Sequence, residues 1–144
     1  MPELPELEVV REVLDRHIVG QGIEAVEVTG SALVVRDLTQ RGLPAALTGA
    51  TVAAVTRRGK FLRLELAPTP GGQPLEPTLY LTINPKLTGR LQLAAKGEKR
   101  YAKTHVVFRL ANGRELRYID AKSMGQMYLS ATMDGVVGYA ELGP

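Results

Sequence analysis

Two alternating apolar runs, at residues 105–110 and 114–119, are separated only by Ala111, Asn112 and Gly113. Asn followed by Gly between two such runs is the strongest short-range signal for a β-hairpin, because both residues tolerate the positive φ angles of tight hairpin turns. The sequence therefore predicts a pair of antiparallel strands here, which constrains the chain to a fold that contains antiparallel sheet.

Further short apolar runs are spaced almost regularly along the chain. We expect strands at residues 23–29, 51–57, 61–66, 79–83, 90–94 and 127–130, with a weaker candidate at 33–35. Gly59 and Lys60 occupy the expected tight turn between two of them. These strands predict a mainly β fold, namely a β-sandwich of about eight short antiparallel strands or, alternatively, a barrel.

A helix is predicted at residues 5–19, in front of all the strands. Its apolar residues recur at spacings of three, four and four, at Leu7, Val10, Leu14 and Ile18. Gly20 supplies a C-terminal stop. A second, short helix is expected at residues 39–47, closed by Gly49. We expect the long N-terminal helix to lay its apolar face against the sandwich.

The composition excludes several classes of protein. A chain of 144 residues forms one domain that can bury a core without a metal or disulfide. Cys is absent, which excludes disulfides, thiol catalysis and Cys-ligated zinc from this chain. No apolar run approaches the roughly 20 residues of a membrane span, and Glu3, Glu6 and Glu8 stand where a signal peptide would be basic or apolar. We therefore expect a soluble cytoplasmic protein with no membrane partner.

The charge is distributed unevenly. Residues 1–50 carry four Arg and Lys against eight Asp and Glu, whereas residues 51–144 carry fourteen against seven. A basic later part indicates a face that binds a polyanion such as nucleic acid. The alternative is an ordinary solvated surface.

The first three residues have a chemical interpretation and a structural one. If Met1 is removed, Pro2 becomes a free secondary amine with the carboxylate of Glu3 beside it, which places a nucleophile next to a proton carrier. The structural interpretation is that Pro suits the first turn of a helix and acidic residues suit its dipole.

Four stretches taken together resemble the formamidopyrimidine-DNA glycosylase and endonuclease VIII family of base-excision repair enzymes. They are residues 1–8, 57–62, 87–91 and 116–120, the last followed by Gly125. The resemblance covers the whole chain but only the N-terminal half of the family. It implies that residues 1–144 are a single catalytic domain. The family's helix-two-turn-helix and zinc-finger domain would be absent, so any zinc is expected there and no cofactor in this chain.

The resemblance assigns three catalytic residues. Pro2 is implied to attack the anomeric carbon of a damaged nucleotide and form a Schiff base, and Glu3 to act as general acid and base. An α-amino group has a pKa of about 8, so a neutral fraction exists at neutral pH. Lys60 is implied to reach the phosphate beside the lesion and to donate a proton during elimination. Its alternative is a solvated turn lysine.

The resemblance also implies a set of DNA-binding residues: Glu6, Arg57, Arg58, Leu87, Lys103, His105, Lys122, Ser123 and Met124. Glu6 would contact the opened sugar, and the two Arg residues would lie on the phosphate-facing surface. Leu87 and Met124 would fill the gap left by a flipped base, or else pack in the core. Glu8 is expected to be solvated.

Some of these positions depart from the family or remain open. Lys122, Ser123 and Met124 stand where familiar members carry Arg-Arg-Phe, and Ser123 cannot replace a bidentate Arg contact to the orphaned base. His105 is interpreted either as a phosphate donor or as a structural residue. Lys96, Lys99 and Arg100 would either contact the DNA backbone or keep their loop soluble.

These observations predict a DNA glycosylase with abasic-site lyase activity, acting as a monomer on oxidised bases in damaged double-stranded DNA. The isolated domain is expected to be weak or inactive on an intact lesion. One alternative is a non-enzymatic DNA-binding module, which would follow if Met1 is retained and Pro2 stays an amide. Another is an unrelated sandwich domain that binds proteins.

Overall fold

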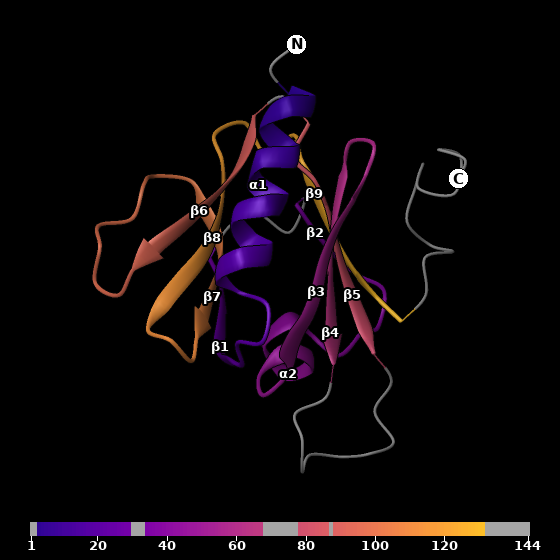
Figure 1. Ribbon diagram of the computed structural model, residues 1–144, viewed down its shortest axis with the longest axis vertical. Helices are drawn as coiled ribbons and strands as arrows, with labels where there is room; N and C mark the ends of the chain where they lie inside the picture. The colour runs from indigo at the N-terminus through magenta and orange to yellow at the C-terminus, as the bar shows by residue number, and fades with distance from the viewer. Residues whose placement is uncertain (1–2, 30–33, 68–77, 87, 132–144) are drawn as a thin grey trace.

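A computed structural model describes residues 3–29, 34–67, 78–86 and 88–131, with side chains from residue 7 onward. Figure 1 shows a mainly β molecule with two sheets and two helices among these residues. The four-stranded sheet contains, in spatial order, β1 (Ile23–Val28), β7 (Thr104–Leu110), β8 (Arg114–Asp120) and β6 (Gly89–Ala95). The five-stranded sheet contains β2 (Val35–Asp37), β9 (Gln126–Ser130), β5 (Leu79–Asn84), β4 (Phe61–Ala67) and β3 (Thr51–Arg58).

The predicted hairpin is confirmed as β7–β8. Phe108 pairs with Leu116 across it, and the backbone N–H of Gly113 donates to the carbonyl of Leu110 at 3.0 Å. Gly113 has a φ of 88°, and the Asn112 side chain accepts a hydrogen bond from the backbone of Arg114 at 2.9 Å. The two residues therefore have different roles in the turn. Gly113 adopts the left-handed backbone conformation, and Asn112 stabilises the turn through its side chain.

The expectation of an entirely antiparallel fold of about eight strands is corrected by β2. The described residues form nine strands, and β2 pairs in parallel with β9, with Arg36 opposite Tyr128. β2 has three residues and only one of them, Val35, is apolar, so no alternation in the sequence indicates its partner or direction. The weak candidate at 33–35 therefore identified this strand only at its first residue.

The N-terminal helix α1 spans Glu3–His17, two residues earlier at each end than expected. Leu14 and Ile18 are buried in the core, and Gly20, with a φ of 90°, lets the chain turn away after the helix. α1 packs against β3. No helix in the described part of the chain is long and apolar enough to cross a membrane.

The short helix α2 spans Leu43–Leu47, so the expected start at residue 39 was too early. The carboxylate of Asp37 accepts hydrogen bonds from the backbone N–H groups of Thr39 and Gly42. These amides are therefore held in a turn instead of a helix, and α2 begins only where Pro44 suits its first turn.

One hydrophobic core lies between the two sheets. Val106, Phe108 and Leu116 come from the four-stranded sheet, and Leu64 and Leu81 from the five-stranded sheet. Each is almost completely shielded from solvent. Full burial of such a side chain contributes about 1.5–3 kcal/mol. The sheets therefore support each other, and the loops at their ends are held by a rigid framework.

Candidate functional site

One end of the molecule collects stretches that are far apart in the sequence. The start of α1, the β3–β4 turn, the β5–β6 connection and the β8–β9 loop all lie at the upper end of Figure 1. The strands produce this arrangement, because β3, β5 and β8 all run toward that end. Of the four family-like stretches, 1–8 contains the start of α1, 57–62 the β3–β4 turn, and 87–91 part of the β5–β6 connection. The fourth, 116–120, is the part of β8 that ends here.

Lys60 lies in the β3–β4 turn. Gly59 has a φ of 58°, which permits the tight reversal, and the Lys60 side chain is exposed. Its Nζ lies 5.8 Å from the ring centroid of Phe61, which is fully buried. The ammonium group therefore sits at the surface beside a fixed apolar support, a position from which it can meet a phosphate.

Arg57 joins this turn to α1. Its Nε donates to Oε1 of Glu8 at 2.8 Å, and its Nη1 donates to the carbonyl oxygen of Gly59 at 2.8 Å. Glu8 also accepts from Arg11 at 2.8 Å. Hydrogen bonds from Arg11 and Arg57 lower the pKa of Glu8 to about 2. Glu8, which was expected to be solvated, keeps part of its side chain exposed and in addition links two arginines. Arg58, the last residue of β3, is half-buried.

The carboxylate of Asp120 is the centre of the β8–β9 loop. The residue is completely buried at the end of β8. It accepts hydrogen bonds from the Tyr118 hydroxyl at 2.8 Å and from the backbone N–H groups of Lys122 at 3.3 Å and Gly125 at 2.7 Å, and from the Thr88 hydroxyl. Burial raises the pKa of Asp120, but these hydrogen bonds outweigh it and hold the pKa below its usual value. Asp120 therefore stays ionised.

Two glycines make room for the Tyr118 hydroxyl. A Cβ atom on Gly89 would lie 2.3 Å from this oxygen, and one on Gly125 would lie 1.9 Å from it. Burial, followed by the effect of Asp120, raises the pKa of Tyr118, so the hydroxyl remains a donor. Gly89 begins β6 and Gly125 ends the β8–β9 loop, so both connections close on one side chain.

The three residues of the β8–β9 loop that depart from the family lie at the surface to different extents. Met124 keeps 42 % of its surface exposed, and Lys122 is exposed. Ser123 is half-buried, has a φ of 55°, and places its Oγ 3.5 Å from Nε2 of His105. Met124 is thus presented outward and does not pack in the core.

His105 is buried, with 3 % of its surface exposed. Its Nε2 lies 3.0 Å from the carbonyl oxygen of Asp120, so the ring N–H donates to that oxygen in the matching tautomer. This geometry favours the structural interpretation of His105. Lys103, in the turn just before β7, is exposed with a φ of 67°, and its carbonyl accepts from the Asp120 backbone N–H at 3.1 Å.

Several predicted site residues lie outside the described part of the chain. Pro2 and Leu87 are not described at all, and Glu3 and Glu6 are described only as backbone of α1. Among the residues that are described, no group of three or more His, Cys, Asp or Glu side chains could hold a metal ion. The described geometry at this end therefore comes from Lys60, from Arg57 and Glu8 beside it, and from the β5–β6 connection and the β8–β9 loop.

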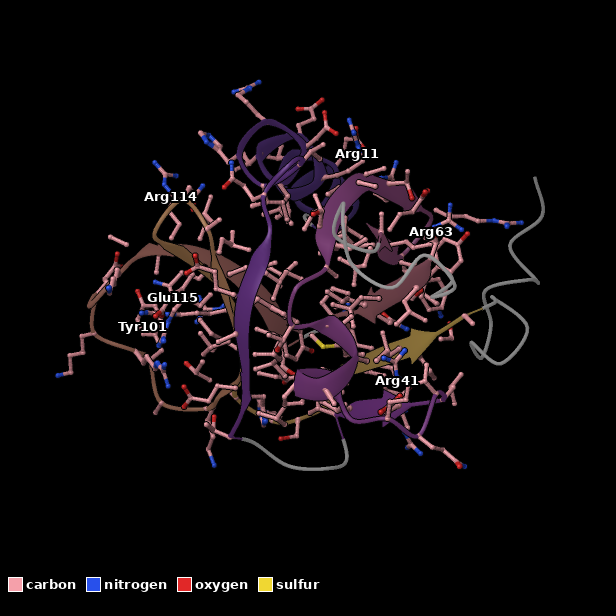
Figure 2. All side chains as sticks on the ribbon, turned by 90° about the horizontal axis from the view of Figure 1, so that it is seen from below. Arg11, Arg41, Arg63, Tyr101, Arg114 and Glu115 are labelled. Atoms are coloured by element: carbon pink, nitrogen blue, oxygen red, sulfur yellow. The ribbon has the colours of Figure 1, made fainter. Side chains whose placement is uncertain are left out.

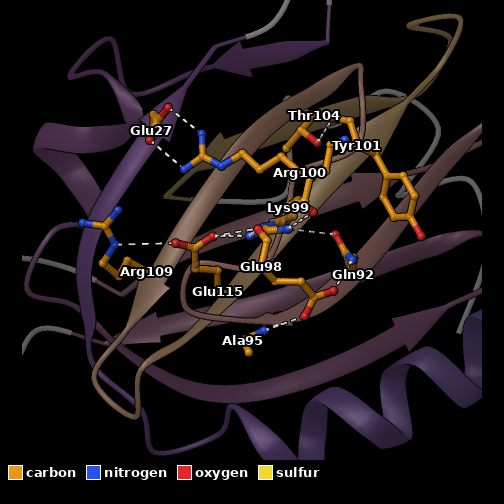
Figure 3. A network of polar contacts seen from close by, with 11 residues as sticks. Glu27, Gln92, Ala95, Glu98, Lys99, Arg100, Tyr101, Thr104, Arg109 and Glu115 are labelled. Atoms are coloured by element: carbon orange, nitrogen blue, oxygen red, sulfur yellow. Dashed lines mark hydrogen bonds and ion pairs between the residues drawn. The ribbon is translucent and has the colours of Figure 1, made fainter.

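A second polar network fixes the basic β6–β7 loop (Figure 3). Arg117, with 1 % exposure, donates to Oε1 of Glu115 through Nε and Nη2 and to the carbonyl of Glu98 at 2.7 Å. Arg100 forms two hydrogen bonds with Glu27, at 2.8 and 3.0 Å. The Arg100 side chain therefore pairs with a residue of β1, whereas the side chains of Lys96 and Lys99 are exposed.

Charged side chains also surround the molecule away from this network. Figure 2 shows the labelled side chains of Arg11, Arg63 and Arg114 toward the outline of the molecule in this view. Sequence reasoning missed both the Arg117 network and the Asp120 cluster. The only signal for Asp120 was its place in the family-like stretch that ends at Gly125.

The fold of two sheets identifies the class of domain, together with the start of α1, the Lys60 turn and the two loops that lie at one end of it. Residues 1–127 match the model of the formamidopyrimidine-DNA glycosylase N-terminal domain, and the chain belongs to that family.

Individual relatives support this placement. The chain is 33% identical over 146 residues to a formamidopyrimidine-DNA glycosylase of Latilactobacillus sakei, covering 100% of this chain and 49% of that protein. It is 39% identical over 128 residues to one from a Parafrankia species, covering 87% and 43%. The chain thus spans about half the length of the curated relatives it matches.

Solved structures show the same fold. The Lactococcus lactis Fpg protein in complex with DNA containing FAPY-dG is similar with a TM-score of 0.75 and 32% identity, over 90% of this chain and 44% of that one. The same protein with DNA containing an abasic site gives the same TM-score and identity.

Proposed function

We propose that this chain is the catalytic N-terminal domain of a base-excision repair DNA glycosylase with abasic-site lyase activity. The observation that carries the proposal is the meeting, at one end of the domain, of the start of α1 with the Lys60 turn, in a chain that belongs to this family. In this proposal the two sheets form a β-sandwich and α1 is the long helix that directly follows the nucleophile Pro2 in the sequence. The domain works as a monomer in the cytoplasm.

The proposed reaction begins at Pro2. Once Met1 has been removed, the Pro2 nitrogen forms a bond to C1′ of the damaged nucleotide, and the glycosidic bond breaks with its electron pair leaving on the base, which takes up the proton lost from the Pro2 nitrogen. Glu3 protonates the ring oxygen as the sugar opens, which leaves an iminium between Pro2 and C1′. The iminium makes the C2′ proton acidic, and its removal expels the 3′ phosphate.

Lys60 and its neighbours hold the DNA strand in this reaction. The exposed Lys60 ammonium binds the phosphate beside the lesion and supplies a proton during elimination. Arg58 and Lys103 add charge to the phosphate-facing surface, which strengthens binding without selecting sequence. Glu6 contacts the opened sugar. Leu87 and Met124 fill the gap left by the flipped base.

The proposed substrate is double-stranded DNA with an oxidised base. The support comes from the Lactococcus lactis relative, whose complexes contain FAPY-dG in one case and an oxidised pyrimidine in another. Ser123 offers no bidentate contact to the base opposite the lesion, so we propose a weak opposite-base preference. No cofactor takes part in the steps assigned to this chain.

A second candidate is a DNA-binding module without turnover. It is favoured by Lys122, Ser123 and Met124 in the β8–β9 loop, which stand where the family resemblance leads us to expect Arg-Arg-Phe. If Met1 were retained, only this second candidate would remain, because the Pro2 nitrogen would be part of an amide and could not act as a nucleophile.

The two candidates are separated by incision of a duplex that carries one abasic site. Intact mass first establishes whether Met1 is absent. The enzyme proposal expects protein without Met1 to cleave at the abasic site and to leave an undamaged duplex intact. Binding of the abasic duplex with no cleavage would favour the module, and no preference for the abasic duplex would contradict both.

A further inference from the structure

The β5–β6 connection and the β8–β9 loop share one buried anchor. Thr88 belongs to the first and lies 32 residues from Asp120, yet its hydroxyl donates to Oδ1 of Asp120. Gly125 belongs to the second, and its backbone N–H donates to Oδ2 at 2.7 Å. The Asp120 carboxylate therefore holds both loops at once: Oδ1 accepts from the β5–β6 connection, and Oδ2 accepts from the β8–β9 loop.

The β8–β9 loop turns its backbone inward around Asp120. The N–H of Lys122 donates to Oδ1 at 3.3 Å, that of Ser123 to the Asp120 carbonyl at 3.3 Å, and Met124 contributes a further backbone hydrogen bond to the carboxylate. The side chains of Lys122 and Met124 are nevertheless exposed. The loop is thus held by its amides, which leaves its side chains available to a partner.

The β5–β6 connection is held in a similar way. The backbone N–H of Lys86 donates to the Asn84 side chain at 3.2 Å, and the N–H of Gly89 donates to the Pro85 carbonyl at 2.9 Å. Lys86 has a φ of 53°, a conformation that needs such fixed contacts to persist. Thr88 then joins this turn to Asp120.

We infer that Asp120 is a positioning residue that fixes the β8–β9 loop against the β5–β6 connection and so presents Met124 to the gap in damaged DNA. This inference rests on the proposed function. Ordering a mobile loop during binding weakens affinity, so a loop that is already fixed binds a gapped duplex more tightly. The phosphate contacts proposed for Arg58, Lys60 and Lys103 lie outside this loop, so binding of an intact duplex should change little.

The test compares Asp120→Asn with Thr88→Val and with Glu24→Gln, an exposed acidic residue on β1 that serves as a matched control. Asn keeps the shape of Asp but directs an NH₂ group at N–H donors. In the free protein we expect Asp120→Asn to raise amide hydrogen exchange about tenfold or more at both Gly89 and Gly125. Thr88→Val should raise it at Gly89 only, and Glu24→Gln at neither.

The second measurement uses duplexes with and without a tetrahydrofuran abasic-site analogue, with 2-aminopurine opposite the analogue to report stacking. Asp120→Asn should lose about fivefold in its preference for the gapped duplex, with a smaller fluorescence change, and should bind the intact duplex like the wild type. If Asp120→Asn does not fold, as judged by circular dichroism, Thr88→Val carries both measurements.

The outcomes separate the inference from the function on which it rests. Unchanged exchange at both loops in the folded Asp120→Asn protein, or an unchanged gap preference, overturns the inference while the proposed function stands. A wild-type protein that does not distinguish the two duplexes contradicts the proposed function, and with it the role of Asp120 toward DNA. The exchange measurement still decides whether Asp120 joins the loops.

Discussion

Arg57 Nε donates to Glu8 Oε1 at 2.8 Å, which joins β3 to α1 across 49 residues of sequence. The same guanidinium donates to the carbonyl of Gly59, next to Lys60. One side chain therefore sets the position of the turn that carries Lys60 relative to the helix that begins with Glu3. A lysine at this position could not do this, because only the planar guanidinium of Arg supplies two donors in fixed directions.

Arg57→Lys should lower the rate of abasic-site cleavage more than it weakens DNA binding. Lys keeps the positive charge but cannot donate in two fixed directions, so the Lys60 turn loses its attachment to α1. We expect about a tenfold lower single-turnover cleavage rate and a change in Kd within about twofold.

Arg114→Lys is the control, because Arg114 is exposed on the β7–β8 hairpin at the other end of the domain. It should leave both quantities unchanged. A loss of affinity at Arg57 with an unchanged cleavage rate would show instead that Arg57 contacts phosphate.

The stabilising contribution of Glu8 should depend on pH in a defined direction. Its pKa in the folded protein is lowered to about 2, whereas the pKa of Glu in an unfolded chain is about 4.3. A group with a lowered pKa stabilises the fold fully above the unfolded pKa and loses that contribution as the pH falls through the folded pKa. The difference in melting temperature between the wild type and Glu8→Gln should be constant from neutral pH to about pH 5 and shrink toward pH 2. A difference that grows on acidification would contradict the assignment.

Gly125→Ala should destabilise the fold, because the new Cβ would lie 1.9 Å from the Tyr118 hydroxyl and 2.9 Å from the Asn84 carbonyl. Overpacking of this kind costs about 1–3 kcal/mol, measurable by urea denaturation. Gly22→Ala is the matched control, since its nearest neighbour, the Ala50 carbonyl, is 4.0 Å away and its φ is not positive.

Adding Tyr118→Phe to Gly125→Ala should recover part of the lost stability by removing the hydroxyl with which the methyl group collides. Strictly additive losses would show that the collision is relieved in another way.

Lys60→Ala should reduce abasic-site cleavage by about tenfold or more, whereas Lys99→Ala should change it by less than about twofold. Both lysines are exposed, but only Lys60 lies at the end of the domain where α1 begins. The measurement is the single-turnover rate at saturating protein. Equal effects of the two substitutions would mean that Lys60 is one surface charge among several.

Local patterns in the sequence predicted most of the fold. The Asn112-Gly113 turn, the strand runs and the face of α1 with Leu14 and Ile18 are short-range signals, and the structure has elements at each of them. The parallel pairing of β2 and the late start of α2 were not predicted. The parallel pairing depends on an edge of β9 that β2 can reach only in the folded chain. The start of α2 depends on the hydrogen bond that the Asp37 carboxylate accepts from the Thr39 amide.

The candidate site was less accessible to sequence reasoning. The resemblance assigned roles to Lys60 and to the loop at Met124, but it did not indicate which residues hold them in place. Asp120 joins loops that approach only because β8 and β5 run to the same end of the molecule, and Glu8 meets Arg57 only once α1 packs on β3. No spacing within the sequence carries that information.

Borohydride trapping on duplex DNA with one abasic site tests the central claim most directly. Protein without Met1 is incubated with this DNA and sodium borohydride, digested, and examined by mass spectrometry. The proposed mechanism predicts one covalent adduct, on the N-terminal peptide at Pro2, and no adduct when Met1 is retained. Absence of an adduct from protein without Met1, or an adduct at Lys60 instead, would contradict it.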